Sequence, residues 1–151
     1  QYNALNDVVI NPGLSARMMQ FEMYIDKQFV CPQRADGIII ATPTGSTAYN
    51  LSAGGPILYP SLNAVALVPM FPHTLSSRPI VISANSEIEF HLKAHPFTTP
   101  HISCDGTINT AIDINSHITI KKANTLLTII HPSDYSYFST LRQKLGWESR
   151  T

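Results

Sequence analysis

The sequence has little charge, and this limits the kinds of surface that it can present. Charged residues make up 13% of its 151 residues, about half the share in an average soluble domain. We therefore expect part of the surface to be covered by another domain or by another copy of the chain. Ten basic residues balance ten acidic ones, so the charge indicates neither nucleic acid nor an anionic membrane as a partner.

Cysteines and long apolar runs are scarce too. Cys31 and Cys104 are the two cysteines, and we interpret them as reduced thiols of a cytoplasmic protein rather than as a disulfide framework. No apolar run approaches the roughly 20 residues that span a bilayer, and the first residues do not show the basic-then-apolar pattern of a secretory signal. The apolar fraction of 44% is nevertheless that of a folded domain, and 151 residues suit a single one.

Alternation of apolar and polar residues, the pattern of β-strands, dominates the sequence. In residues 87–93, Ile88, Phe90 and Leu92 alternate with charged residues and histidine. Many short strands separated by turn residues predict a mainly β fold, a two-sheet sandwich with one or two short helices. The expected strands cover residues 8–10, 21–25, 37–41, 64–68, 80–83, 87–93, 112–114, 118–120 and 126–130.

Helices should be few and short, because eleven prolines are spread along the chain and proline interrupts helices. One helix is predicted over residues 48–53, capped by the hydroxyl residues before it and ended by Gly54-Gly55-Pro56. A second is predicted over residues 136–145, with Gly146 as its stop and Trp147 as an anchor against a neighbouring domain or subunit. Asp105-Gly106 predicts a hairpin turn.

Residues 36–56 carry the strongest chemical signal. A buried strand leads into a turn with hydroxyls on Thr42, Thr44, Ser46 and Thr47, and a short helix follows. Unpaired amides at a helix start favour anions, and hydroxyls suit a ribose, a base edge or a phosphate. The turn lacks the lysine of the nucleotide-binding P-loop. On these residues alone, a purely structural helix cap explains the turn equally well.

At this point the sequence resembles a known family, the NAD kinases. The string Thr42-Pro43-Thr44-Gly45-Ser46-Thr47-Ala48-Tyr49, with Asp36 before it, looks like a signature of that family. Further similar segments are residues 4–7 (Ala-Leu-Asn-Asp), 72–79 (Pro-His-Thr-Leu-Ser-Ser-Arg-Pro), 103–105 (Ser-Cys-Asp) and 144–147 (Lys-Leu-Gly-Trp). The resemblance covers nearly the whole chain and is closest to bacterial members.

The resemblance implies an NAD site assembled from several parts of the chain. Asn6 and Asp7 would hydrogen-bond the dinucleotide, although Asp7 stands where the family usually has Glu. Asp36 would face the nicotinamide side, and Arg17 and Arg34 would face the ligand, where a guanidinium suits a pyrophosphate. The other implied contacts are Thr44, Thr47, Ala48, Tyr49, Asn50, Leu51, Ser52, Phe71 and Thr107, the last at a position where close relatives carry Gln.

The family transfers the γ-phosphate of ATP to the 2′-hydroxyl of NAD's adenosine ribose, which gives NADP. A Gly-Gly-Asp-Gly loop in an N-terminal α/β domain supplies its catalytic Asp, and this loop does not occur in residues 1–151. The resemblance therefore implies that residues 1–151 form the C-terminal NAD-binding domain, with no catalytic residue of their own. ATP and a divalent metal such as Mg²⁺ would bind through the other domain. The chain would bind NAD or NADP and form a homo-oligomer, a dimer or tetramer.

Two other functions stay open. A non-catalytic β-module that senses NAD or NADP would use the same residues without a catalytic loop. A lipid or sphingoid-base kinase shares the two-domain plan, but its substrate needs an apolar pocket where this sequence has hydroxyls. We expect no metal site. His91 and His95 have the four-residue spacing of a metal site on a helix, but they fall at an expected strand that Pro96 interrupts.

Overall fold

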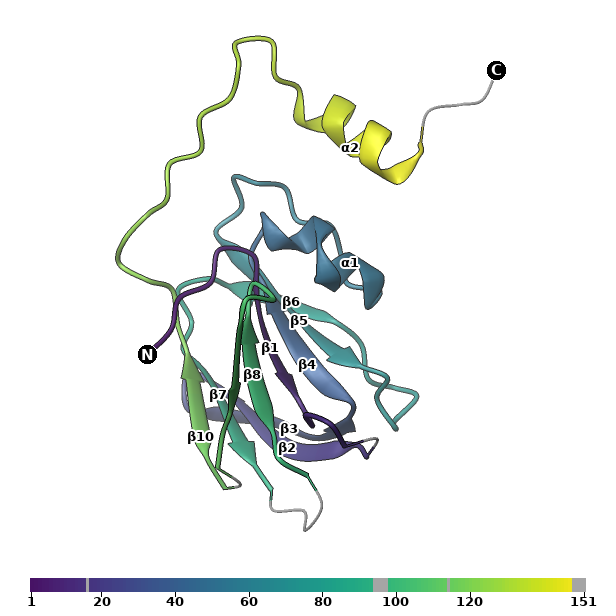
Figure 1. Ribbon diagram of the computed structural model, residues 1–151, viewed down its shortest axis with the longest axis vertical. Coiled ribbons are helices and arrows are strands. Elements are labelled where there is room, and N and C mark those ends of the chain that lie inside the picture. The colour runs from purple at the N-terminus through teal and green to yellow at the C-terminus, as the bar shows by residue number, and fades with distance from the viewer. Residues whose placement is uncertain (16, 94–97, 114, 148–151) are drawn as a thin grey trace.

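Two antiparallel β-sheets and two short helices make up the computed structural model, which describes residues 1–15, 17–93, 98–113 and 115–147 (Figure 1). The mainly β, two-sheet fold predicted from the sequence is confirmed. One sheet has the order β6-β5-β4-β1-β8-β9 and the other β10-β7-β2-β3. The strands are β1 (Asp7–Asn11), β2 (Met19–Ile25), β3 (Gln28–Ala35), β4 (Gly37–Ala41), β5 (Ala64–Met70), β6 (Ile80–Ser83), β7 (Ile88–Leu92), β8 (His101–Cys104), β9 (Ile108–Ala111) and β10 (His117–Ile120).

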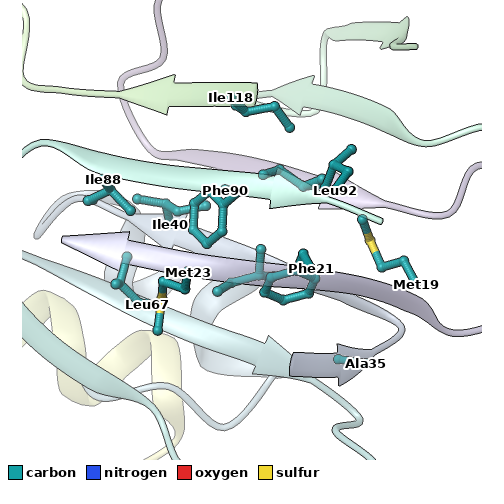
Figure 2. Close-up of a cluster of buried hydrophobic side chains, with 12 residues drawn as sticks. Met19, Phe21, Met23, Ala35, Ile40, Leu67, Ile88, Phe90, Leu92 and Ile118 are labelled. Carbon is teal, nitrogen blue, oxygen red and sulfur yellow. The ribbon is translucent and has the colours of Figure 1, made fainter. Parts of the chain in front are cut away.

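The main core lies between the two sheets (Figure 2). Phe21 of β2 and Phe90 of β7 meet edge to face at its centre, with ring centroids 5.7 Å apart. Ile38 and Ile40 of β4 pack against them from the six-stranded sheet. Full burial of side chains of this size contributes about 1.5–3 kcal/mol each, so the apolar alternation in the sequence is what joins the sheets.

Strand β4 is buried on both faces, as its uninterrupted apolar sequence predicts. Ile39 points away from the main core and packs with Val9, Ala66 and Leu58 in a second buried cluster. Leu58 belongs to the segment after α1 (Tyr49–Ser52). The second cluster therefore ties the segment that carries the Gly-Ser-Thr turn and α1 to the middle of the six-stranded sheet.

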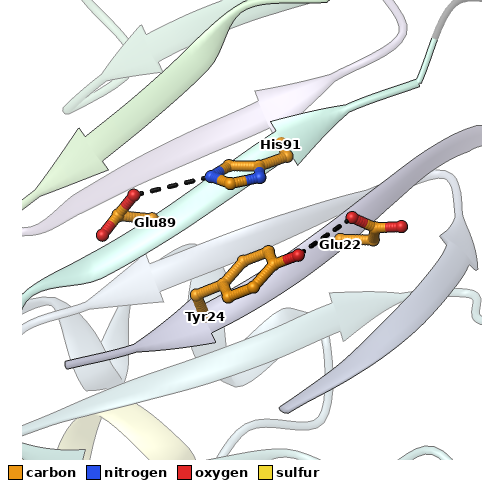
Figure 3. A network of polar contacts seen from close by, with 4 residues as sticks. All are labelled: Glu22, Tyr24, Glu89 and His91. Carbon is orange, nitrogen blue, oxygen red and sulfur yellow. Dashed lines mark hydrogen bonds and ion pairs between the residues drawn. The ribbon is translucent and has the colours of Figure 1, made fainter. Parts of the chain in front are cut away.

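The opposite face of the four-stranded sheet is polar (Figure 3). The Tyr24 hydroxyl donates a hydrogen bond to Glu22 at 3.1 Å, and Glu22 also pairs with Lys93 at 2.9 Å. His91 lies 3.5 Å from Glu89 and stacks on His117 of β10, with ring centroids 4.0 Å apart. These side chains are the polar half of the alternation in β2 and β7, so this face takes no part in the sandwich core.

Both predicted helices are present. A 3₁₀ turn, η1 (Gly45–Thr47), leads into α1, and α2 spans Tyr137–Leu145. The Ser136 hydroxyl accepts a hydrogen bond from the Ser139 amide at 3.3 Å, and Gly146 ends α2 in the left-handed conformation. The prediction that hydroxyls cap the first helix is wrong, because neither η1 nor α1 has a side-chain cap hydrogen bond. Among the described residues, neither α-helix has the length and apolar character needed to span a bilayer.

Two strand predictions are wrong, and β3, β8 and β9 lie where no strand was predicted. Residues 126–130 form no strand but lie in an extended arm that leads away from the sheets to α2 (Figure 1), with Leu126 and Ile130 exposed. Strand β9 ends at Ala111, before the predicted strand at 112–114, and Ile114 lies outside the described residues. His95, considered above as a metal ligand, also lies outside them. Strand β3 was not predicted, because it is an edge strand with mostly exposed side chains and a proline in its middle.

Candidate functional site

A cleft of about 590 Å³ runs along β1, from Asn6 and Asp7 at its start to Pro12 and Gly13 after its end, and is bordered by α1, the end of β5 and the turn between β8 and β9. Residues far apart in the sequence meet here because β1 is the central strand between β4 and β8. Six of the residues that the resemblance assigns to the NAD site line this cleft, namely Asn6, Asp7, Asp36, Ala48, Tyr49 and Phe71. The fold thus brings the first motif, the Gly-Ser-Thr segment and the end of β5 to one place.

The entry of β1 is fixed on one side by Thr42. The Thr42 hydroxyl donates to the Leu5 carbonyl at 2.6 Å, and the Thr42 amide donates to the Asn6 carbonyl at 2.9 Å. The same hydroxyl accepts the Gly45 amide at 3.1 Å. Gly45 lies so close to β1 that a Cβ there would be 2.0 Å from the Asn6 carbonyl oxygen. Glycine is therefore required for this approach of the turn to the strand.

Ser46 and Asn50 serve the fold rather than opening to the cleft. The Ser46 hydroxyl donates to the Pro43 carbonyl at 2.6 Å and accepts the Leu58 amide at 2.9 Å. The buried Asn50 amide group donates to the carbonyls of Ser46 at 2.8 Å and Pro56 at 3.0 Å. Thr42, Ser46 and Asn50 thus have structural roles, which join the turn to β1 and to the segment after α1 rather than capping the helix.

Carboxylates dominate the electrostatics of the cleft. Burial, and then the charge of Asp105, raise the pKa of Asp7, whose exposed fraction is 6%. Burial alone would raise the pKa of Asp105, but the amides of Leu5, Asn6 and Asp7 donate to its carboxylate and hold it below the usual value. With Asp36 also in the lining, the cleft offers acceptors for hydroxyl and amide donors such as those of a nucleoside.

The described residues offer little for holding a cofactor's metal. Among them, no group of three or more His, Cys, Asp or Glu side chains is arranged to bind a metal ion. Asp7 and Asp105 are close, but the amides of residues 5–7 already occupy the Asp105 oxygens. The arrangement supports recognition of a polar organic ligand through the acceptors in the lining.

Several residues singled out in the sequence lie outside this lining. Ser52 lines a second cleft of about 360 Å³, which shares Met70 and Phe71 with the first. Arg34 is exposed on β3 and Arg17 precedes β2. The hydroxyl of Thr107 donates to the Cys104 carbonyl at 3.2 Å within the hairpin turn. Those not brought into the lining of the first cleft are Arg17, Arg34, Thr44, Thr47, Asn50, Leu51, Ser52 and Thr107.

Two lining residues have features that the sequence did not show. Phe71 adopts a left-handed backbone with φ of 44°, rare for a bulky residue, and its side chain is 80% exposed between the two clefts. Asp105 forms the predicted turn with Gly106 but also lines the first cleft. The Asp-Gly pair signalled the turn, whereas its proximity to β1 depends on sheet order.

Comparisons with known proteins show which family the chain is similar to. The family model described as the ATP-NAD kinase C-terminal domain matches residues 5–132. NAD kinases of Chromohalobacter salexigens and Azotobacter vinelandii are 55% and 53% identical over 98% and 99% of this chain. The chain spans 50% and 51% of the length of these two curated relatives.

Solved structures of similar proteins extend the likeness to the fold. A yeast NADH kinase complexed with NADH superimposes with a TM-score of 0.86 and 28% identity, over 98% of this chain and 45% of that one. An Archaeoglobus fulgidus NAD kinase in complex with ATP gives a TM-score of 0.71 and 32% identity, over 80% of this chain and 46% of that one. With the family model matching most of its length, the chain belongs to the ATP-NAD kinase C-terminal domain family.

Proposed function

We propose that the chain is the dinucleotide-binding half of an NAD kinase, an enzyme that transfers the γ-phosphate of ATP to the 2′-hydroxyl of NAD's adenosine ribose. The observation that carries this proposal is the cleft along β1, which Asn6 and Asp7 line together with Ala48 and Tyr49. Relatives that are more than 50% identical carry the name NAD kinase. The acidic lining supports binding of a ligand rich in hydroxyl and amide donors.

In the proposed mechanism, this chain binds and orients the NAD ribose. The carboxylate of Asp7 accepts hydroxyl donors, and Tyr49 supplies a ring for stacking beside them. ATP, Mg²⁺ and the general base are proposed to come from the part of the protein that lies outside these residues. Phosphoryl transfer depends mainly on positioning and charge neutralisation, so the role of this half is to hold the accepting hydroxyl in place.

The first prediction is that Tyr49→Ala weakens NAD binding about 5- to 150-fold. The Tyr49 side chain is half exposed and lines the cleft, and stacking of a base on an aromatic ring contributes about 1–3 kcal/mol. We would titrate the ¹⁵N-labelled chain with NAD and follow its amide resonances, a method that also detects weak binding.

Tyr135→Ala is the matched control for this prediction. Tyr135 has a similar exposure but stacks on His131 in the extended arm, and it does not line the cleft. Its variant should bind NAD like the unchanged chain. Equal affinities of the two variants would remove Tyr49 from the site.

NAD, NADP and a sphingoid base titrated in parallel distinguish a dinucleotide site from a lipid-kinase site.

We also propose that the protein is cytoplasmic and forms a homo-oligomer, a dimer or tetramer. The low share of charged residues and the exposed apolar side chains support an oligomer in which part of this surface is buried against another subunit. Leu126, Leu127 and Ile130 are exposed along the arm, and Phe138 and Trp147 are exposed at α2. These residues offer apolar surface for another domain or another copy of the chain.

The second prediction concerns this self-association. Light scattering of the purified chain should give a mass at least twice the 16.6 kDa of one chain, because association removes the exposed apolar side chains from water. The measurement is repeated over a range of concentrations and at high salt, since apolar association should survive screening of charges. A monomer at tens of micromolar would contradict the proposal.

A further inference from the structure

The turn between β8 and β9 carries a carboxylate that accepts hydrogen bonds from three consecutive main-chain amides. Asp105 Oδ2 accepts the Leu5 amide at 2.7 Å, and Oδ1 accepts the amides of Asn6 at 2.7 Å and Asp7 at 3.1 Å. In return, the Asp105 amide donates to the Asp7 carbonyl at 3.0 Å. Hydrogen bonds to a charged acceptor are stronger than neutral ones, so this contact holds the entry of β1.

The turn itself does not require a carboxylate at this position. Asp105 and Gly106 have φ values of 51° and 67°, and the Thr107 amide closes the turn on the Cys104 carbonyl at 3.1 Å. Asn-Gly or Gly-Gly forms such a turn as well as Asp-Gly does. The charged side chain is therefore used for the amides of β1 rather than for the bend.

The segment before β1 is held from two sides. Thr42 donates from the β4 side to the carbonyls of Leu5 and Asn6, whereas Asp105 accepts from the amides of residues 5–7 on the β8 side. Val8 pairs with Cys104 in the β1–β8 register, so Asp105 continues this contact beyond the last strand pair. Asn6 and Asp7, whose side chains the proposed ligand would contact, lie within the held segment.

We infer that Asp105 is a positioning residue of the cleft, which holds the main chain of Leu5, Asn6 and Asp7 so that Asn6 and Asp7 line the site. The inference rests on the proposed function for the identity of the ligand, whereas the contact with the amides stands without it. Asp105 also sets the charge around Asp7, because its carboxylate helps to raise the Asp7 pKa. Other ionisable groups among the described residues of this region are Asp36 and Tyr49, in the same lining, and Cys104, whose pKa is raised by burial and by both carboxylates.

The third prediction tests this contact without any ligand. In Asp105→Asn, hydrogen exchange at the amides of Leu5, Asn6 and Asp7 should accelerate about tenfold or more, since a neutral acceptor replaces a charged one and one of its two oxygens is lost. Asp36→Asn is the matched control, because it removes a carboxylate from the same cleft with no hydrogen bond to these amides among those that the structure describes. Unchanged exchange in Asp105→Asn would overturn the inference.

A pH titration of the unchanged chain guards against misfolding of the variant, and the same titration of the folded variant adds a second test. In the unchanged chain, the three amide proton shifts should titrate together, with a pKa below the ordinary value for Asp, as Asp105 loses its charge. In a folded Asp105→Asn variant, the pKa of the Asp7 carboxyl should fall, because the neighbouring negative charge is removed. Amide shifts that do not follow a common acidic titration would contradict the contact.

Titration with NAD separates the inference from the proposed function. If the unchanged chain binds NAD, Asp105→Asn should bind it about tenfold or more weakly, the loss expected from a misplaced hydrogen-bonding group. Faster amide exchange with unchanged affinity would overturn the positioning role. If the unchanged chain does not bind NAD while the amide results hold, the proposed function fails and the contact with β1 stands.

Discussion

The purified chain, supplied with ATP, Mg²⁺ and NAD, is expected to form NADP no faster than the uncatalysed background. Its residues contain no Gly-Gly-Asp-Gly loop, the feature expected to hold the ATP phosphates and to supply the general base. Loss of a general base alone costs roughly 10²–10⁴-fold in rate, and loss of phosphate positioning costs more. Among the carboxylates in the cleft, Asp105 is not available as a replacement, because its oxygens accept hydrogen bonds from three amides.

A coupled assay for NADP tests this fourth prediction, with full-length Azotobacter vinelandii NAD kinase as the positive control. That relative is 53% identical to this chain, which spans 51% of its length. Addition of the uncovered part of the relative, produced separately, should raise the rate if this chain supplies the dinucleotide-binding half. NADP formation by the chain alone, free of contaminating kinase, would place a catalytic base among these residues. If the uncovered part of the Azotobacter vinelandii enzyme forms no NADP together with this chain, the result would instead favour a dinucleotide sensor.

The sandwich could be predicted because its signals are local. Ile88, Phe90 and Leu92 alternate with polar residues, and the structure buries all three. Ser136 and Gly146 likewise mark the ends of α2 through contacts within a few residues. Strand β3 was not predicted because its side chains are mostly exposed and show no apolar alternation; it forms a strand by pairing with β2 at the edge of the sheet. Residues 126–130 misled for the opposite reason: they are apolar, but no strand pairs with them in the described residues.

The sequence predicted several residues of the candidate site but not their hydrogen-bond partners. The motif around Tyr49 marked the segment, and its resemblance to a family brought Asn6 and Asp36 into the same hypothesis. Sequence alone did not show that the hydroxyls of Thr42 and Ser46 form hydrogen bonds within the fold, because tertiary structure brings their partners Leu5 and Leu58 close to them. The role of Asp105 was hidden likewise, since its partners lie about 100 residues away.

Gly45→Ala should destabilise the protein by about 2–4 kcal/mol and lower its Tm by roughly 5–15 °C. The added Cβ would lie 2.0 Å from the Asn6 carbonyl oxygen and 2.4 Å from its carbonyl carbon, and both belong to the main chain. Relief therefore requires the η1 turn to move away from β1. That movement weakens the hydrogen bonds through which Thr42 joins Gly45 to Asn6. It also shifts Ala48 and Tyr49 in the cleft lining, so NAD affinity should fall together with stability.

Gly54→Ala is the matched control for this fifth prediction, because it adds the same methyl group to the same segment. Gly54 has a φ of +80°, but no described atom lies within 4 Å of its Cβ position, so its variant should lose about 1 kcal/mol through backbone strain alone. Thermal unfolding of both variants, with NAD titration of the folded proteins, separates strain from collision. A Gly45→Ala variant as stable as Gly54→Ala would show that the turn does not press on β1. A variant that loses stability while keeping full NAD affinity would separate the Ala48–Tyr49 segment from the ligand, because the displacement that relieves the collision moves that segment first.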